Sequence, residues 1–274
     1  DRTMWETLSA RLAFIHDYLV DESERPRFEA WVRELLAPAA KELGWTAAPD
    51  ESADRRAVRG DIMDTLAYSG HDPEVIAKAK GLAEQAMQKP GSVDPDLVTM
   101  AINAAAHNGD AALYDQYLAK MKTANDPNEY YLYSEGLRQF RHPELVKRNL
   151  EMALTPEVRP QDATGFLGRM LGDPYTQTQA WEFLKAHWKE LEPKLLAAYT
   201  PGEIVRTTGN FCTTQLRDDA KQFFSGQQLP AVQHSLRQAE EQSNACIDFK
   251  TQQQGVLRAW LDQNSGSARA ATVQ

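Results

Sequence analysis

The sequence predicts an all-α protein, a HEAT- or armadillo-like α-solenoid of antiparallel helix pairs. Three observations support this class. Apolar residues recur every three or four positions in many segments, as at Val58, Ile62 and Leu66, which is the spacing of one helix face. Runs in which β-branched or aromatic residues alternate with polar ones, the pattern of strands, are nearly absent. Helix pairs follow one another at intervals of about 30 to 40 residues, the range of helical repeats.

A recurrent junction separates the predicted helices. A helix end is followed by a small or polar residue, then by Asp or a substitute, and often by Pro. We expect Gly to take the left-handed conformation that ends a helix, Asp to accept hydrogen bonds from the free N–H groups of the next helix, and Pro to occupy its first position. Each short turn predicts two antiparallel neighbours. The junction occurs at 70–73, 108–110, 125–127, 141–143 and 172–174.

Helical spacing and these junctions together place the helices along the chain. The last predicted helix is expected to be two helices, broken between Asn244 and Thr251. The widest gap, 44–50, is either a seam between subdomains or only a long loop. The predicted helices are 3–20, 24–43, 52–69, 73–88, 94–107, 111–123, 127–139, 143–153, 160–171, 175–190, 192–198, 201–208, 214–225 and 229–262.

These helices predict one domain over residues 1–264, followed by a flexible tail over 265–274. The first residues resemble neither a signal peptide nor a native start, since the first Met is Met4. We therefore expect this chain to be a piece of a longer protein.

Composition excludes several classes of function. The chain has 274 residues, of which 42% are hydrophobic and 25% charged, and its formal net charge is -9. An acidic surface repels phosphates, so no nucleic-acid partner is expected, and charges interrupt every apolar stretch, so no membrane span is expected. Cys212 and Cys246 lie far apart in the sequence, and two buried thiols are favoured over one disulfide. Cytoplasm and periplasm fit the composition equally, so localisation is unknown.

The sequence contains no recognisable catalytic centre. None of its six His residues lies in H-E-x-x-H, the helical zinc-peptidase motif, and nucleophile-elbow, Walker and dinucleotide motifs are absent too. His71, His107 and His142 fall at or beside inter-helix turns, where a solvated capping residue is favoured over a metal ligand. For His187, a local hydrogen bond to Glu190 is favoured over a metal site.

Five tryptophans lie among apolar residues at helical spacing, so core packing is favoured over a ligand platform. Many packing elements without a reactive centre fit an interaction or closure module better than an enzyme. The five are Trp5, Trp31, Trp181, Trp188 and Trp260.

Several stretches have the order and spacing of one known family. The strongest is T-P-E-V-R-P-Q-D at 155–162, and the others support it along nearly the whole chain. Together they resemble the C-terminal helical domain of the M1 zinc aminopeptidases, the group of puromycin-sensitive aminopeptidase, aminopeptidase N and the endoplasmic-reticulum aminopeptidases. The supporting stretches are E-L-L-A-P at 34–38, L-G-W at 43–45, F-L-G-R at 166–169, A-W-E-F-L-K at 180–185, H-W-K-E-L at 187–191, F-C-T-T at 211–214, F-F at 223–224, L-R-Q-A-E at 236–240 and W-L at 260–261.

This resemblance implies a bowl of HEAT-like helix pairs that packs over a catalytic domain of the same polypeptide and encloses its active-site cavity. It implies no cofactor in this chain, because the family's zinc and its H-E-x-x-H ligands belong to upstream domains. The alternative is a free-standing helical-repeat scaffold that binds a partner protein.

The resemblance also implies residues that contact a peptide substrate. Arg169 and Tyr199 match family positions on inner helices, and Arg138 and Arg206 are weaker candidates on neighbouring segments. A guanidinium suits a peptide carboxylate because the two can form a bidentate pair. The alternatives are a surface or inter-helix salt bridge for each Arg, and simple packing for Tyr199.

Overall fold

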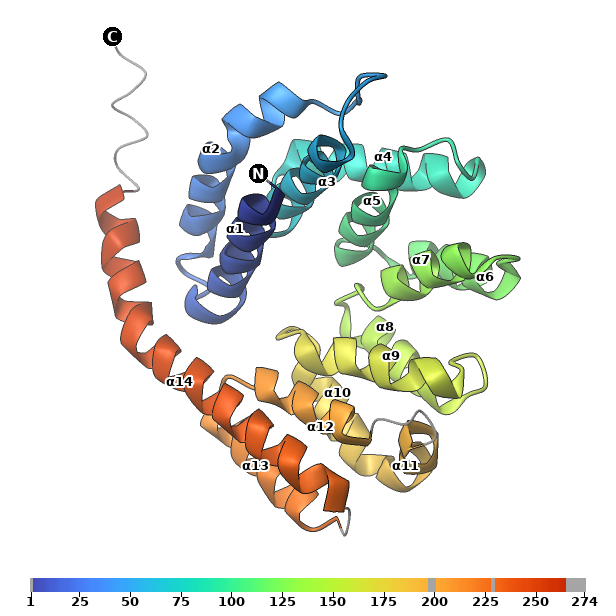
Figure 1. Ribbon diagram of the computed structural model, residues 1–274, viewed down its shortest axis with the longest axis vertical. Helices are drawn as coiled ribbons and strands as arrows, with labels where there is room; N and C mark the ends of the chain where they lie inside the picture. Colours follow the sequence, from blue (N-terminus) through green and yellow to red (C-terminus); the bar gives the residue numbers. More distant parts are fainter. Residues whose placement is uncertain (1, 197–200, 228–229, 265–274) are drawn as a thin grey trace. The chain divides into compact units, whose positions relative to one another are not determined.

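The computed structural model describes residues 2–196, 201–227 and 230–264. Within these ranges the chain forms fourteen α-helices, one π-helical turn, one 3₁₀ turn and no strand (Figure 1), which confirms the all-α class. The chain divides into two compact units, which we call unit 1 (residues 1–108 and 252–274) and unit 2 (residues 109–251). The loop at 44–50 lies inside unit 1, so it is not the boundary between these units. The predicted tail at 265–274 lies outside the described residues.

Unit 1 is organised around α3, which contacts α1, α2, α4 and α5. Buried Arg59 of α3 donates to the main-chain oxygens of Leu43 and Gly44 and to both carboxylate oxygens of Glu51, at 2.6 and 2.7 Å, so one side chain holds the 44–50 loop. The hydrogen bond from Arg59 lowers the pKa of Glu51. The elements are α1 (Arg2–Phe14), the π-helical turn η1 (Ile15–Leu19), α2 (Arg25–Leu43), α3 (Ala53–Tyr68), α4 (Pro73–Gln88), α5 (Pro95–His107) and the end of α14 (Pro230–Asn264).

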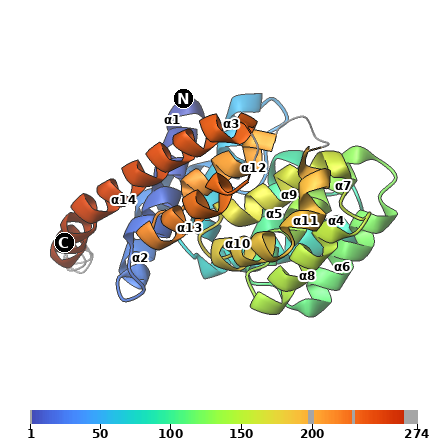
Figure 2. The ribbon, with the colours of Figure 1, turned by 90° about the horizontal axis from the view of Figure 1, so that it is seen from below.

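Unit 2 is organised around α9, which contacts α8, α10, α11 and α12. Figures 1 and 2 show two layers within this unit, with α7, α9 and α12 in one and α6, α8 and α10 in the other. The elements are α6 (Ala111–Thr123), α7 (Pro127–Leu137), α8 (Pro143–Leu154), α9 (Pro160–Gly172), α10 (Gln177–Ala186), α11 (Trp188–Leu196), α12 (Pro201–Thr207), the 3₁₀ turn η2 (Thr208–Asn210), α13 (Thr214–Ser225) and the first part of α14.

The junctions work partly as predicted. Asp72, Asp110 and Asp126 each accept a hydrogen bond from a backbone N–H of the helix that follows. His142 makes no such bond, and Asp173 accepts from the N–H of Tyr175, before α10 begins. Side-chain caps therefore account for three of the five helix starts.

The predicted role of glycine at these junctions is wrong. At 70–73, the residue with positive φ is His71, at 41°, and neither Gly70 nor Gly172 has a positive φ. Gly70 is required for a different reason, because a Cβ there would lie 2.8 Å from the carbonyl oxygen of Leu66. The close approach of backbone to backbone, rather than a left-handed conformation, excludes a side chain at this position.

Two helix boundaries also differ from the prediction. The break expected between Asn244 and Thr251 is absent, and α14 is continuous, because this segment holds neither Pro nor Gly and its asparagine and threonine are tolerated inside a helix. The helix predicted over 175–190 instead ends at Ala186, and α11 begins at Trp188.

The expectation of two free thiols is wrong. Cys212 and Cys246 form a disulfide, with their Cα atoms 5.4 Å apart. Cys212 lies just before α13, and Cys246 lies within α14, which runs beside α13 in unit 2 (Figures 1 and 2). This side-by-side arrangement brings together two cysteines that are separated by 34 positions.

The prediction that the tryptophans pack in the core is confirmed for Trp181 and Trp188 and wrong for Trp260. Trp181 and Trp188 are buried and pack against Phe223 and Phe224 with ring centroids 5.4 to 5.6 Å apart. Trp260 is 37% exposed, because only one side of the end of α14 packs against the protein.

None of the described helices is long and apolar enough to cross a membrane.

Candidate functional site

Three of the four predicted contact residues lie in one layer of unit 2. Arg138 follows α7 as its C-cap, Arg169 lies in the last turn of α9 and Arg206 in that of α12. Tyr199 lies outside the described residues. Because α7, α9 and α12 form the same layer (Figure 2), the structure gives the three arginines a common setting that their sequence positions do not reveal.

Arg138 links α7 to α9. Its guanidinium donates to the main-chain oxygen of Gly165 at 3.0 Å, and its Nε donates to that of Ser134 at 3.2 Å. The guanidinium also lies 5.6 Å from the centre of the Phe166 ring. Burial lowers the pKa of Arg138, and the positive charge of Arg169 acts in the same direction. These contacts use much of the donor capacity of Arg138, so Arg138 helps to position α9 and keeps fewer free donors than Arg169.

Arg169 is the more available cation. Its Nη2 donates to the side-chain oxygen of Gln139 at 3.1 Å, and Gln139 is buried. Arg169 itself is exposed, and it forms no ion pair with any described residue. A guanidinium held by one neutral amide keeps donors free for a carboxylate. Two contacts therefore connect the end of α7 with α9: Arg138 bonds to Gly165, and Arg169 bonds to Gln139, the residue after Arg138.

Arg206 lies on α12, which contacts α9. It is exposed and, within the described part of the chain, has no ion-pair partner. The next residue, Thr207, packs on α9, since a Cβ at Gly168 would lie 3.4 Å from its hydroxyl oxygen. Glycine at 168 therefore allows α12 to approach α9 closely.

An aromatic cluster near this layer was not predicted. The Arg159 guanidinium lies 4.3 Å from the centre of the Tyr130 ring. It donates to the Tyr131 hydroxyl at 3.0 Å and to Asp162 at 2.6 Å, and the bond to Asp162 raises the pKa of Arg159. Arg159 and Asp162 lie in the stretch 155–162 that carries the family resemblance, but that stretch does not indicate a contact with the two adjacent tyrosines. This arginine already has a carboxylate partner, which makes it a weaker candidate than Arg169.

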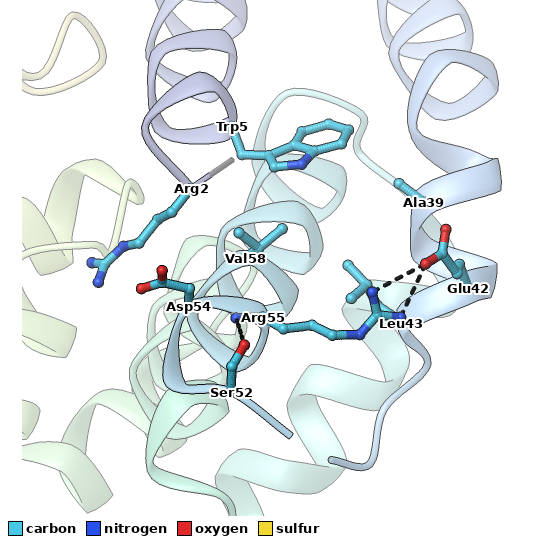
Figure 3. A pocket seen from close by; sticks show the side chains of 9 residues that line it. All are labelled: Arg2, Trp5, Ala39, Glu42, Leu43, Ser52, Asp54, Arg55 and Val58. Carbon is cyan, nitrogen blue, oxygen red and sulfur yellow. Dashed lines mark hydrogen bonds and ion pairs between the residues drawn. The ribbon is translucent and has the colours of Figure 1, made fainter. Parts of the chain in front are cut away.

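Unit 1 contains a pocket of about 310 Å³ between α1, α2 and the start of α3 (Figure 3). The Trp5 indole extends from α1 toward α2, and Arg55 reaches across to Glu42 at 3.0 Å. Arg2 is likewise paired with Glu6 at 2.7 Å. Since both cations of the lining have carboxylate partners inside the protein, the pocket offers little charge to a ligand.

A second pocket of unit 1, of about 290 Å³, lies between α3 and α5 and is acidic. Burial raises the pKa of Asp61 in its wall. Asp64 and Asp96 also line it, and Arg56 pairs with Asp96 at 3.3 Å.

Over the whole described part of the chain, no group of three or more His, Cys, Asp or Glu side chains could hold a metal ion. The predicted local bond between His187 and Glu190 is confirmed, at 3.0 Å.

Comparison with known proteins identifies the class to which this fold belongs. A family model described as the ERAP1-like C-terminal domain matches residues 1–245. The chain therefore belongs to the family of ERAP1-like C-terminal domains, and the predicted resemblance is confirmed.

Its relatives are aminopeptidases. The chain is 25% identical to glutamyl aminopeptidase of Bitis rhinoceros over 271 residues, which cover 96% of this chain and 28% of that protein. It is 27% identical to aminopeptidase N of Bos taurus over 234 residues, covering 81% of this chain and 24% of the bovine protein. It is also 24% identical to aminopeptidase M1-A of Oryza sativa subsp. japonica over 221 residues, which cover 78% of this chain and 25% of the rice protein. The chain thus spans less than a third of the length of each of these relatives.

Proposed function

We propose that this chain is the C-terminal domain of a zinc metalloaminopeptidase, in which it closes over the catalytic domain and shapes the cavity that holds the peptide. The observation that carries the proposal is the family match over residues 1–245. It is supported by relatives that are aminopeptidases, of whose length the aligned regions cover 28% and 24%. The chain contains no H-E-x-x-H. Zinc and its ligands are therefore assigned to the catalytic domain of the parent enzyme, with which this domain would pair.

The layer of α7, α9 and α12 is the proposed peptide-facing surface. Arg169 supports this assignment best, because it is exposed, held in place by Gln139 and without a carboxylate partner among the described residues. We propose that Arg169, assisted by Arg138 and Arg206, binds carboxylate groups in the distal part of a peptide. Tyr199, which lies outside the described residues, keeps its predicted role as a peptide contact.

Kinetics of the parent enzyme test this assignment. Arg169→Ala is expected to raise KM about tenfold for a peptide with a free C-terminal carboxylate, the loss of one charge-assisted hydrogen bond. It should leave kcat/KM for an aminoacyl anilide unchanged, since that substrate does not reach the distal surface. Arg148→Ala is the matched control, because Arg148 lies on α8 in the other layer and pairs with Asp115 at 2.6 Å. Equal losses in both variants, or an equal loss with an amidated peptide, would contradict the role of Arg169.

The alternative function, a free-standing scaffold, makes an opposite prediction about the coding sequence. A zinc aminopeptidase requires an H-E-x-x-H and a downstream Glu encoded before Asp1. A stop codon and a start site there would instead establish the scaffold. The isolated chain is expected to bind no stoichiometric zinc and to hydrolyse no aminoacyl substrate, and measured turnover by it would refute both functions.

A further inference from the structure

The end of α14 lies against the start of α2, within unit 1. Arg258 pairs with Asp21 at 2.6 Å and with Glu24, and Asp21 also accepts a hydrogen bond from Gln254. Further along both helices, Arg27 pairs with Asp262, and the rings of Trp31 and Trp260 meet edge to face with centroids 5.1 Å apart. Polar and charged groups thus make most of this contact.

Glu24 is the unusual member of this contact, because its side chain is only 2% exposed. Its ion-pair partner is Arg258, which lies 234 positions away in the sequence. The second carboxylate oxygen of Glu24 is also buried, and it has no hydrogen-bond partner within the described structure. A buried carboxylate is tolerated only when it is paired, so the burial of Glu24 depends on the presence of α14.

Little apolar burial adds to these ion pairs. Among residues 252–264, only Leu261 is buried, whereas Val256 is 61% and Trp260 37% exposed. The first part of α14 is attached differently, through buried Val232, Leu236 and Ala239 and through the disulfide at Cys246. Exposed ion pairs contribute little to stability, and a buried one roughly offsets its own desolvation. The end of α14 is therefore a weakly attached segment of a firmly attached helix.

We propose that residues 252–264 form a clasp on α2 that opens as a local unit, and that the Glu24–Arg258 ion pair keeps it closed. Opening returns the Glu24 carboxylate to water and so restores the favourable hydration free energy that burial removes. The released segment loses its packing on α2, and an unpacked helix end frays readily, so opening also exposes its backbone amides. Helix α14 begins in unit 2 and ends in unit 1. When the clasp is closed, the end of α14 packs on α2; when the clasp is open, it does not.

Hydrogen–deuterium exchange of the 274-residue protein tests the clasp. Arg258→Ala leaves Glu24 buried without a partner, so we expect the amides of residues 252–264 to exchange at least tenfold faster, a change that corresponds to about 1.4 kcal/mol. Those of residues 232–248 and of α3 should keep their rates. In the unmodified protein, raising the salt concentration to about 1 M should speed amide exchange of residues 252–264, because salt screens exposed charge pairs. Arg237→Ala is the control, since Arg237 is an exposed arginine of the same helix that forms no ion pair with the described residues.

A second variant separates an ionic clasp from general destabilisation. Replacing Glu24 and Arg258 together by leucine removes the buried charge and keeps an apolar contact, so exchange of residues 252–264 should be slower than in Arg258→Ala and less sensitive to salt. Equal exchange in Arg258→Ala and Arg237→Ala would overturn the proposal. So would loss of protection throughout α1–α5 in Arg258→Ala, which would make the segment an integral part of unit 1. A double leucine variant that exchanges as fast as Arg258→Ala would overturn the role of the ion pair.

Discussion

Tyr114 of α6 donates its hydroxyl hydrogen to the side-chain oxygen of Asn149 of α8 at 2.8 Å, and both side chains are buried. The amide nitrogen of Asn149 donates in turn to the main-chain oxygen of Leu137, at the end of α7, at 2.6 Å. One asparagine thus joins three helices of unit 2. The connection lies next to Arg138 and Gln139, so it supports the layer that carries the candidate site.

Removing this asparagine should destabilise unit 2. Asn149→Ala leaves the buried Tyr114 hydroxyl without a partner and leaves the Leu137 carbonyl only a long hydrogen bond, at 3.4 Å, from the N–H of Phe140. Loss of a buried hydrogen-bond partner costs about 1–3 kcal/mol. We expect the free energy of unfolding to fall by about 2–4 kcal/mol, measured as the midpoint of urea unfolding. Tyr114→Phe removes only one of the two bonds and should cost about half as much. Equal losses in the two variants would show that the bond to Leu137 contributes nothing.

Buried tyrosines should make unit 2 sensitive to alkali. Burial raises the pKa of Tyr114 and Tyr133 to about 12, and that of Tyr117 above its usual range. The unfolded chain loses these protons near pH 10, whereas the folded chain keeps them until about pH 12. The unfolded state therefore binds fewer protons between these values, and stability falls as pH rises. Each tyrosine contributes about 1.4 kcal/mol per pH unit to this fall.

Urea unfolding measured at pH values from about 9 to about 12, on both sides of the ordinary tyrosine pKa, checks the alkaline sensitivity. Tyr117→Phe should make the free energy of unfolding fall less steeply with pH. The slope should change by the contribution of one titrating proton, about 1.4 kcal/mol per pH unit. A slope that is the same in Tyr117→Phe and the unmodified protein would refute this account.

Much of the fold was predictable because its signals are local. The limits of α4, α6 and α13 coincide with the predicted 73–88, 111–123 and 214–225, since capping residues and prolines act on the helix that they begin. The exposure of Trp260 was not predictable in this way, because it depends on what the helix packs against, which spacing along one segment does not specify.

The candidate site was predictable only in part. Family positions selected Arg138, Arg169 and Arg206, but their contacts depend on the layer formed by α7, α9 and α12. The role of Gln139, which holds Arg169, left no sequence signal, because a buried glutamine next to an arginine resembles any polar pair. Arg159 and its tyrosines were missed for the same reason, since their contact joins α7 to the start of α9.

Two glycines should respond in opposite ways to replacement by alanine. A Cβ at Gly60 of α3 would lie 2.5 Å from the main-chain oxygen of Asp96, whereas a Cβ at Gly81 of α4 would meet nothing within 4 Å. Gly60→Ala should destabilise the protein by about 1–3 kcal/mol, because the backbones must separate. Gly81→Ala should stabilise it by about 0.5–1 kcal/mol, the gain in helix propensity. Urea midpoints that move in the same direction for both variants would contradict the close contact between α3 and α5.

The disulfide between Cys212 and Cys246 should stabilise unit 2 mainly by restricting the unfolded chain. It closes a loop across a sequence separation of 34, for which loop-closure entropy gives about 4 kcal/mol. Replacing both cysteines by alanine should lower the free energy of unfolding by roughly that amount, with α13 and the first part of α14 losing amide protection first. Dithiothreitol should lower the urea midpoint of the unmodified protein to that of the variant and leave the variant unchanged. Because the bond joins the turn before α13 to α14, its loss should not affect amide protection in α3. Equal loss of protection in α3 would show that the two units unfold together.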